Sequence, residues 1–142
     1  MAPSPLRVLV VDDEPPILRM LRFCLAREGF GCETETDPRK ALERIRTGTP
    51  VHILLTDIVM PEMDGLALLR VLRAEERLTQ PIVMTAYSSL DRVLDAYRLG
   101  ALDYLIKPFE SLAVVTEVVR RAEHRYRRWQ RVVARTMRGE VA

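Results

Sequence analysis

Short apolar runs alternate with amphipathic segments along the chain. The apolar runs are rich in β-branched residues, and runs of this length and composition are typical of strands that are buried on both faces of a sheet. Five segments meet this description and are predicted to be strands: 6–11, 31–36, 52–56, 81–85 and 103–106. Each of them is followed by a segment whose apolar residues recur at helical spacing.

These helical segments carry one apolar stripe each. The stripes are Leu18, Leu21, Leu25 and Phe30; Ala41, Leu42 and Ile45; Leu66, Leu68, Leu69 and Leu72; Leu90, Leu94 and Tyr97; and Leu112, Val115, Val118, Val119 and Ala122. Five strand–helix units in succession require right-handed crossovers and a parallel sheet that is covered on both sides. We therefore predict a doubly wound α/β domain with five strands and five helices, in the common strand order 2-1-3-4-5.

The composition fits a single soluble globular domain. The chain has 142 residues, of which 48% are hydrophobic and 30% charged. No apolar run approaches the roughly 20 residues that a membrane span needs, and the N-terminal run is broken by acidic residues too early for a secretory signal. We therefore expect a cytoplasmic location and no contact with a membrane. Cys24 and Cys32 form no CxxC or Cys/His cluster, so we expect buried, reduced thiols.

Charge is distributed unevenly along the chain. Residues 120–142 contain eight arginines and two glutamates, so this segment carries a net charge of +6, and the other 119 residues therefore carry −4. The segment has no helix-turn-helix pattern, and its only aromatic residues are Tyr126 and Trp129. We interpret the arginines as a solvated face of a helix and do not expect this chain to bind nucleic acid.

The apolar residues near the C-terminus extend the fifth stripe. Steps of four and three residues connect Val115, Val119, Ala122, Tyr126, Trp129 and Val133. This spacing predicts that the fifth helix continues as a coiled-coil-like extension, whose Trp129 face would contact a partner chain. The alternative is a frayed, arginine-rich end, with Gly139 as the helix stop.

Chemistry is concentrated where the predicted strands end. In LLTDIVMPEMDG (54–65) an apolar run ends in Asp57 and breaks at once into a turn. In a doubly wound sheet, ligands bind beyond the carboxyl ends of the strands, where the strand order reverses. The residues that follow the other strands at this edge are Asp12, Asp13, Thr85 and Lys107. Three carboxylates, a hydroxyl and one ammonium group are thus predicted to lie together.

This set of residues favours phosphoryl transfer. Three neighbouring carboxylates repel each other unless a cation is present, and hard oxygen ligands without His or Cys suit Mg²⁺. Glycine-rich nucleotide-binding loops are absent from the sequence. A carboxylate nucleophile, a metal ion, a lysine and a threonine are sufficient to phosphorylate an aspartate. Only two of the 22 basic residues are lysines, Lys40 and Lys107, so a lysine at position 107 is unusual for this chain.

Four motifs together resemble the receiver domain of bacterial two-component response regulators. They are VVDDEP, LLTDIVMPEMDG, VMTAY and GALDYLIKPF. The resemblance covers about residues 5–124 and leaves 125–142 as an arginine-rich helical extension or linker. It implies a flavodoxin-like fold, similar to that of chemotaxis regulators, and a phosphorylation-controlled switch rather than a turnover enzyme.

The resemblance also implies a role for each site residue. Asp57 would be the phosphoacceptor and would receive the phosphoryl group from a histidine kinase or a phosphotransfer protein. Mg²⁺ would be bound by Asp12, Asp13 and Asp57, directly or through water, and by the backbone carbonyl of Val59.

Three further residues follow from the same resemblance. Thr85 and Lys107 would contact the phosphoryl group, and Tyr104 would be the switch aromatic that turns inward when Thr85 moves. This would reshape the surface of the fourth helix, the fifth strand and the fifth helix, through which, or through the C-terminal helix, a homodimer could form. The family often has a cis peptide at the Lys107-Pro108 position.

Simpler interpretations stand beside these roles. Asp13 could cap the helix that Pro15 opens, Thr85 could be a turn hydroxyl, and Tyr104 could be a core residue. His52 and His124 are not at the predicted site. A haloacid-dehalogenase-like phosphatase is an alternative function for the chain, although that family has its nucleophile in a DxD pattern after the first strand. A scaffold that is never phosphorylated is a second alternative function.

Two positions differ from what the family often has. Val59 and Tyr87 stand where polar residues are frequent, and neither can orient an attacking water well, so we predict slow hydrolysis of the phosphoaspartate. The segment 110–125 also lacks the charged pattern of the winged-helix transcriptional subclass, which leaves the output open.

Overall fold

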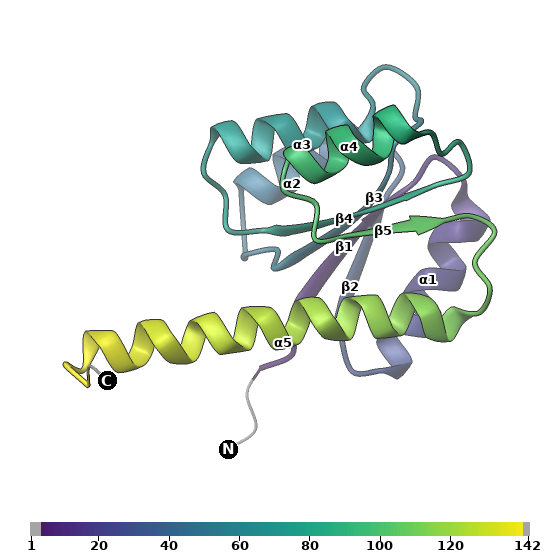
Figure 1. Ribbon diagram of the computed structural model, residues 1–142. Helices are drawn as coiled ribbons and strands as arrows, with labels where there is room; N and C mark the ends of the chain where they lie inside the picture. The colour runs from purple at the N-terminus through teal and green to yellow at the C-terminus, as the bar shows by residue number, and fades with distance from the viewer. Residues whose placement is uncertain (1–3, 141–142) are drawn as a thin grey trace.

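A computed structural model describes residues 4–140 as an α/β domain with one parallel sheet (Figure 1). Its five strands are β1 (Arg7–Val11), β2 (Gly31–Glu35), β3 (Ile53–Asp57), β4 (Gln80–Thr85) and β5 (Asp103–Ile106). The strand order is β2-β1-β3-β4-β5. This confirms the predicted doubly wound sheet and its order, and the strand boundaries differ from the predicted ones by at most one residue.

Five helices cover the two faces of the sheet. They are α1 (Pro15–Arg27), α2 (Pro38–Arg46), α3 (Gly65–Ala74), α4 (Leu90–Arg98) and α5 (Leu112–Met137). Helices α1 and α5 lie on one face, and α2, α3 and α4 lie on the other (Figure 1).

The two cores arise from the alternation of side chains along each strand. In β1, Val8 and Val10 point into the core beneath α1 and α5. Leu9 and Val11 point into the core beneath α2 and α3. All four side chains are at most 1% exposed, which explains why this strand appears in the sequence as a continuous apolar run.

Local capping fixes where most helices begin. Asp64 accepts a hydrogen bond from the backbone N–H of Ala67 (2.7 Å) at the start of α3, and Asp37 and Ser89 cap α2 and α4 in the same way. The interpretation of Asp13 as a helix cap is wrong: the N-cap residue of α1 is Glu14, and its side chain makes no capping bond. Asp13 therefore does not cap α1.

The apolar stripe of α4 is not buried, contrary to the sequence prediction. Leu90 is 72% exposed and Tyr97 78%, and Leu94 is also exposed, whereas Ala96 is the buried residue of the helix. The small side chain of Ala96 meets the core beneath α3, so the larger residues lie on the outward half of the helix. An amphipathic helix is correctly predicted here, but its apolar side faces solvent.

Helix α5 is 26 residues long and runs past the body of the domain (Figure 1). Its first half is buried through Val115, Val118, Val119 and Ala122. The second half continues to Met137, and Gly139 adopts a positive φ of 77° just beyond the end. The predicted helical extension is therefore present as far as Met137, and Gly139 stands at the helix stop that the alternative expected. Residues 141–142 of the predicted extension lie outside the described residues. A division of the chain at residue 124 stays a prediction, because the helix crosses that point without a break.

Both cysteines are half-buried free thiols, less buried than predicted. Burial raises the pKa of the Cys32 thiol to about 11, which keeps it protonated at neutral pH and makes it a poor metal ligand. Between residues 4 and 140, no helix combines the length and the apolar character needed to cross a membrane.

Candidate functional site

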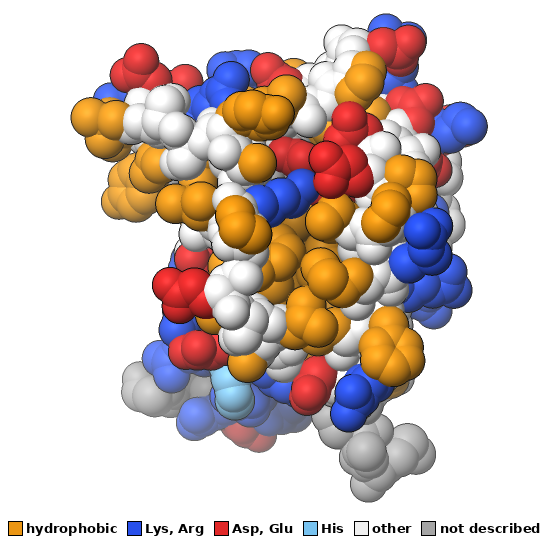
Figure 2. All heavy atoms as spheres, turned by 90° about the vertical axis from the view of Figure 1, so that its right-hand side faces the viewer, with side chains coloured by type: hydrophobic (Ala, Val, Ile, Leu, Met, Phe, Trp, Pro, Cys, Tyr) orange, Lys and Arg blue, Asp and Glu red, His pale blue; other side chains and the backbone are white. Residues whose placement is uncertain are grey.

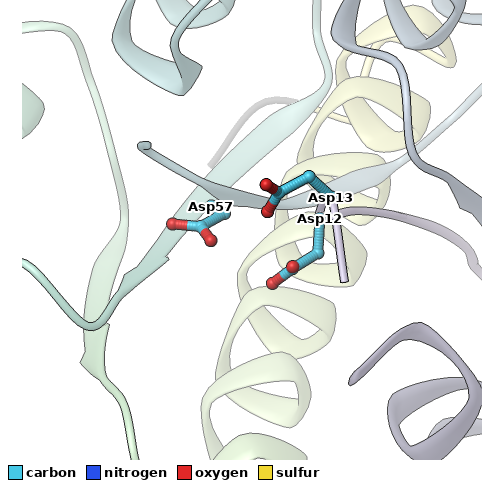
Figure 3. Close-up of side chains that lie close together, drawn as sticks. All are labelled: Asp12, Asp13 and Asp57. Atoms are coloured by element: carbon cyan, nitrogen blue, oxygen red, sulfur yellow. The ribbon is translucent and has the colours of Figure 1, made fainter. Parts of the chain in front are cut away.

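The register of the sheet brings the acidic strand ends together. Val11 of β1 lies opposite Thr56 of β3, so the residues that follow them, Asp12 and Asp57, end at the same level. Asp13 comes next in the chain. Carboxylate oxygens of these three aspartates all lie within 4.8 Å of one another (Figure 3). The predicted acidic cluster is therefore present, and it lies between the two strands where the strand order reverses.

Lys107 joins this cluster from the end of β5. Its Nζ donates to Oδ2 of Asp12 and to Oδ2 of Asp57, the latter at 3.0 Å. The side chain of Lys107 is only 10% exposed and that of Asp12 is fully buried. The backbone N–H of Lys107 donates to the carbonyl of Thr85 (2.9 Å), which continues the β4–β5 pairing to this position. The peptide bond to Pro108 is cis, as the resemblance implies.

Burial and charge act on these groups in opposite directions. Burial raises the pKa of Asp12, and the hydrogen bond from Lys107 only partly offsets this effect. Burial acts to lower the pKa of Lys107, but its hydrogen bonds to Asp12 and Asp57 outweigh burial, so the pKa is raised overall. Lys107 is therefore protonated at neutral pH. A buried carboxylate depends on such a counter-ion.

The cluster suits a divalent cation. When all groups are ionised, three carboxylates and one ammonium group leave two negative charges uncompensated. The carboxylate of Asp13 is exposed, and it makes no ion pair with any residue of the described range 4–140. Oxygen donors with open access to solvent match the preference of Mg²⁺ for a few carboxylates and several waters. The residues present therefore fit the ion that the sequence predicts.

A cleft of about 640 Å³ opens beside the aspartates. Figure 2 shows acidic and basic side chains in the middle of this face, with hydrophobic side chains gathered next to them. One wall carries Asp13, Asp57 and Lys107, and the others come from α1, the β4–α4 loop and the β5–α5 loop. Asp57 is 7% exposed, so the cleft gives access to a carboxylate that is otherwise enclosed.

Glycine at position 65 allows the chain to pass close to the end of β3. A Cβ atom on Gly65 would lie 2.1 Å from the backbone oxygen of Asp57. The N–H of Gly65 also donates to the carbonyl of Ile58 (2.8 Å). The turn that follows Asp57 in the sequence therefore holds the start of α3 against the residue at the centre of the site.

The remaining predicted residues lie around the cluster but not all in the cleft. Thr85 is fully buried at the end of β4, and its Oγ1 accepts from the N–H of Tyr87 (3.1 Å), so it is a turn hydroxyl in this structure. The N–H of Val59 donates to Oδ1 of Asp57 (3.3 Å). Tyr104 is half-buried beside the core under α3, and its hydroxyl is enclosed without a hydrogen-bond partner within residues 4–140.

Sequence reasoning missed the apolar wall of the cleft. Ile17 and Met20 of α1, Phe109 of the β5–α5 loop and Leu112 at the start of α5 line it. The three helical residues belong to amphipathic patterns that indicate only a buried helix face. Their position beside Asp57 depends on how α1 and α5 pack on the same side of the sheet. His52 lies at the other end of β3, away from the site, as expected.

The fold and this site define a doubly wound α/β protein with an acidic, lysine-bridged centre at the switch point of its sheet. Residues 8–119 match the family model of the response regulator receiver domain. The chain belongs to that family. It is a regulator, and the family implies a phosphoacceptor switch of two-component signalling.

Individual relatives agree with this assignment. The chain is 43% identical over 117 residues to the DNA-binding transcriptional regulator NtrC of Escherichia coli, and the match covers 82% of this chain and 25% of NtrC. The chain is 35% identical over 124 residues to the transcriptional regulatory protein TrcR of Mycobacterium tuberculosis, and this match covers 85% of this chain and 48% of TrcR. The chain thus spans only a quarter to a half of these proteins.

A solved structure confirms the architecture. The chemotaxis protein CheY4 of Vibrio cholerae superimposes with a TM-score of 0.77 at 26% sequence identity, covering 84% of this chain and 99% of CheY4. The flavodoxin-like fold expected from the sequence is thereby confirmed.

Proposed function

We propose that the chain accepts a phosphoryl group on Asp57 from a histidine kinase or a phosphotransfer protein. The observation that carries the proposal is the buried contact of Lys107 with both Asp12 and Asp57 at the wall of an open cleft. In the transfer, an oxygen of Asp57 forms a bond to phosphorus while the bond from phosphorus to the donor's imidazole nitrogen breaks. The imidazole leaves as the neutral ring after it takes up a proton.

The acidic cluster would hold the metal ion. Asp12, Asp13, Asp57 and the backbone carbonyl of Val59 are the proposed ligands, and bound Mg²⁺ would supply positive charge to the phosphoryl oxygens. Lys107 already lies at Asp57, so its ammonium group would donate a charge-assisted hydrogen bond to the phosphoryl group.

Thr85 and Tyr104 are the proposed switch pair. The Oγ1 of Thr85 accepts a hydrogen bond in this structure, so its own hydrogen remains available to donate to a phosphoryl oxygen. The enclosed hydroxyl of Tyr104 lacks a partner among the described residues, and an unpaired buried polar group costs about 1–3 kcal/mol. Tyr104 therefore already lies inward in the unmodified chain, at a cost, and the proposed movement of Thr85 would hold it there.

The output surface in this proposal is the outward side of α4 and β5. Leu90, Leu94 and Tyr97 of α4 and Ile106 of β5 are all exposed. Apolar side chains that gather on a surface are characteristic of a protein–protein interface. This surface would receive a downstream partner or a second copy once Thr85 has moved and Tyr104 is held inward.

The test is a phosphate-affinity gel of the purified chain with Mg²⁺ and acetyl phosphate. We expect a retarded band for the wild type that is lost in Asp57→Asn and in the presence of EDTA. Asp64→Asn is the matched control: it changes a nearby carboxylate that only caps α3, and asparagine caps a helix equally well. The control should keep the band.

Other outcomes would assign a different function. A band that survives Asp57→Asn but is lost in Asp12→Asn would point to the phosphatase-like alternative, with its nucleophile after the first strand. If acetyl phosphate and a phosphohistidine donor both leave the wild type unmodified, the protein is a scaffold that binds partners without phosphorylation.

A further inference from the structure

The cleft beside Asp57 has the size and lining of a pocket for a small molecule. Its volume is about 640 Å³, and pockets that bind small molecules measure roughly 300–1,000 Å³. The charged residues of its lining are Asp13, Glu14, Asp57 and Lys107, and most of the others are apolar or aromatic. An apolar enclosure with a few convergent polar groups is typical of a ligand site.

The direction of phosphoryl transfer places the donor's leaving group in this cleft. The attacking oxygen and the leaving group lie roughly in line on opposite sides of phosphorus. Asp57 is enclosed except where it borders the cleft, so the phosphorus atom has to approach from the cleft and the leaving group lies farther out in it. The side chains around that space are Ile17, Met20, Val59, Tyr87, Phe109 and Leu112.

These apolar side chains are accessible to a ligand. Val59, Tyr87 and Leu112 are exposed, and Ile17, Met20 and Phe109 are only partly buried. An apolar group that enters the cleft would remove part of this surface, and its own surface, from water, which is favourable. The wall therefore distinguishes leaving groups by their apolar area.

The charges in the cleft argue against a highly charged leaving group. Lys107 is the one cation among its lining residues within the described range 4–140, and it is already paired with Asp12 and Asp57. Asp13 and Glu14 add negative charge. A pyrophosphate leaving group, as in transfer from a nucleotide, would meet no positive partner here. An acyl group carries no charge before the transfer, so it suits this space better.

A second apolar groove shows what the cleft adds. It has a volume of about 710 Å³ and runs between Leu78 and the end of α5, where Tyr126, Trp129 and Met137 line it. None of its described lining residues is charged. This groove offers apolar surface but no group that binds or attacks a phosphoryl group. An apolar wall and a nucleophilic carboxylate lie together at the cleft beside Asp57.

We propose that this wall selects acyl phosphates with an apolar acyl group as small-molecule phosphodonors for Asp57. The inference rests on the proposed phosphorylation of Asp57 and adds a donor class to phosphohistidine. In the step, an oxygen of the Asp57 carboxylate forms a bond to phosphorus while the bond from phosphorus to the acyl oxygen breaks. The electron pair of that bond leaves with the carboxylate product, so the total charge is unchanged and no proton has to move.

The size of the effect follows from the chain length of the donor. Butyryl phosphate has two more methylene groups than acetyl phosphate, and burial of one methylene changes a rate or binding constant about fourfold. Butyric and acetic acids are almost equally acidic, so their carboxylates leave equally well. A difference in rate therefore reports contact with the wall. Phosphoramidate serves as the reference donor, because its leaving group is ammonia and too small to reach the wall.

The test measures the rate at which the whole chain is phosphorylated, with Mg²⁺ and low concentrations of each donor, on a phosphate-affinity gel. We expect the rate with butyryl phosphate to exceed that with acetyl phosphate about tenfold in the wild type. Met20→Gln combined with Leu112→Gln should reduce this ratio to about two or less. The matched control is Phe23→Gln combined with Ala113→Gln, on the same two helices but outside the cleft, which should keep the ratio.

Two further measurements guard the comparison. Phosphorylation by phosphoramidate shows that a variant is folded and has a working site, and Met20→Gln alone replaces the double variant if that variant is not labelled. Met20→Leu keeps the wall apolar, so it should keep the tenfold ratio.

The outcomes separate this proposal from the proposed function. A ratio near one in a wild type that phosphoramidate labels would overturn the selection of acyl phosphates and leave Asp57 as the phosphoacceptor. A ratio that the glutamine variants do not change would also overturn it. A ratio near one, together with slower transfer from a phosphohistidine protein in the glutamine variants alone, would assign the wall to a protein donor. No labelling by any donor would reject both proposals.

Discussion

The two ends of the sheet depart from ordinary burial in opposite ways. At the carboxyl end, Asp12 and Lys107 are buried charged groups that are held in an ion pair. At the amino end, Leu78, Trp129 and Met137 are exposed apolar groups beside a helix whose arginines are solvated. Buried charge and exposed large apolar surface are the two departures from ordinary burial that carry information.

Each departure has a different origin. The buried ion pair is fixed by the backbone register of three strands, so it is rigid and specific in geometry. The exposed apolar residues lie on or beside one helix that continues past the domain, so packing of the core does not fix their surroundings. Small steric changes at the carboxyl end should therefore disturb the site. Polar substitutions of the exposed apolar residues at the amino end should change the surface and leave the fold intact.

The largest effect should come from Gly65→Ala. The new Cβ would clash with the backbone oxygen of Asp57, and overpacking of this kind costs about 3 kcal/mol of unfolding free energy. Gly31→Ala is the control, because a Cβ there makes only ordinary contacts of 3.7 Å or more. Urea unfolding measures both. A change below about 1 kcal/mol in Gly65→Ala would show that the end of β3 is less rigid than we describe.

Lys107→Met should have the next largest effect. It leaves the buried carboxylate of Asp12 without its hydrogen-bonded partner, and we expect a loss of about 2 kcal/mol at pH 7. The loss should shrink as the pH falls, because protonation of Asp12 removes the uncompensated charge. Millimolar Mg²⁺ should also reduce it if the ion binds the cluster. Lys40→Met, which removes the exposed lysine, should be neutral. An equal loss in both variants would exclude a special role for the ion pair.

A smaller, kinetic effect is expected at Val59 and Tyr87. Both residues line the cleft beside Asp57, with exposed fractions of 38% and 66%. Val59→Asn or Tyr87→Glu would offer a polar group that orients water, and we expect hydrolysis of the phosphoaspartate to become about tenfold faster. That change corresponds to about 1.4 kcal/mol in the barrier. The measurement is the decay of the phosphorylated band over time, with Val93→Asn on α4 as a control. A half-life that neither site variant shortens would contradict the predicted slow hydrolysis.

The smallest effect concerns His52 at the amino end. Burial lowers its pKa, and Arg127 and Arg7 act in the same direction. A histidine with a lowered pKa in the folded state stabilises the fold above its ordinary pKa of about 6.5, and this contribution is lost as the pH falls through the folded pKa. Unfolding between pH 8 and pH 5 should show this decline in the wild type and in the control His124→Gln. It should be weaker in His52→Gln.

Much of the site could be predicted from the sequence. A parallel sheet places all its carboxyl ends at one edge, so Asp12, Asp57 and Lys107 had to lie near each other once the strands were identified. The distances could not be predicted. They depend on the register of β1 against β3 and on the close passage of Gly65, and these are set by packing across the sheet.

The sequence by itself determined the strands and helices, the acidic edge and the continuation of α5, because each depends on local periodicity and on the geometry of parallel strands. The strand order was chosen from the sequence only as a common one, and the structure established it. Only the tertiary structure decided that the apolar stripe of α4 faces outward, that α1 and α5 form the wall of the cleft, and that Leu78 meets the exposed part of α5. Periodicity shows that a helix has an apolar side, but which surface that side meets depends on residues distant in the chain.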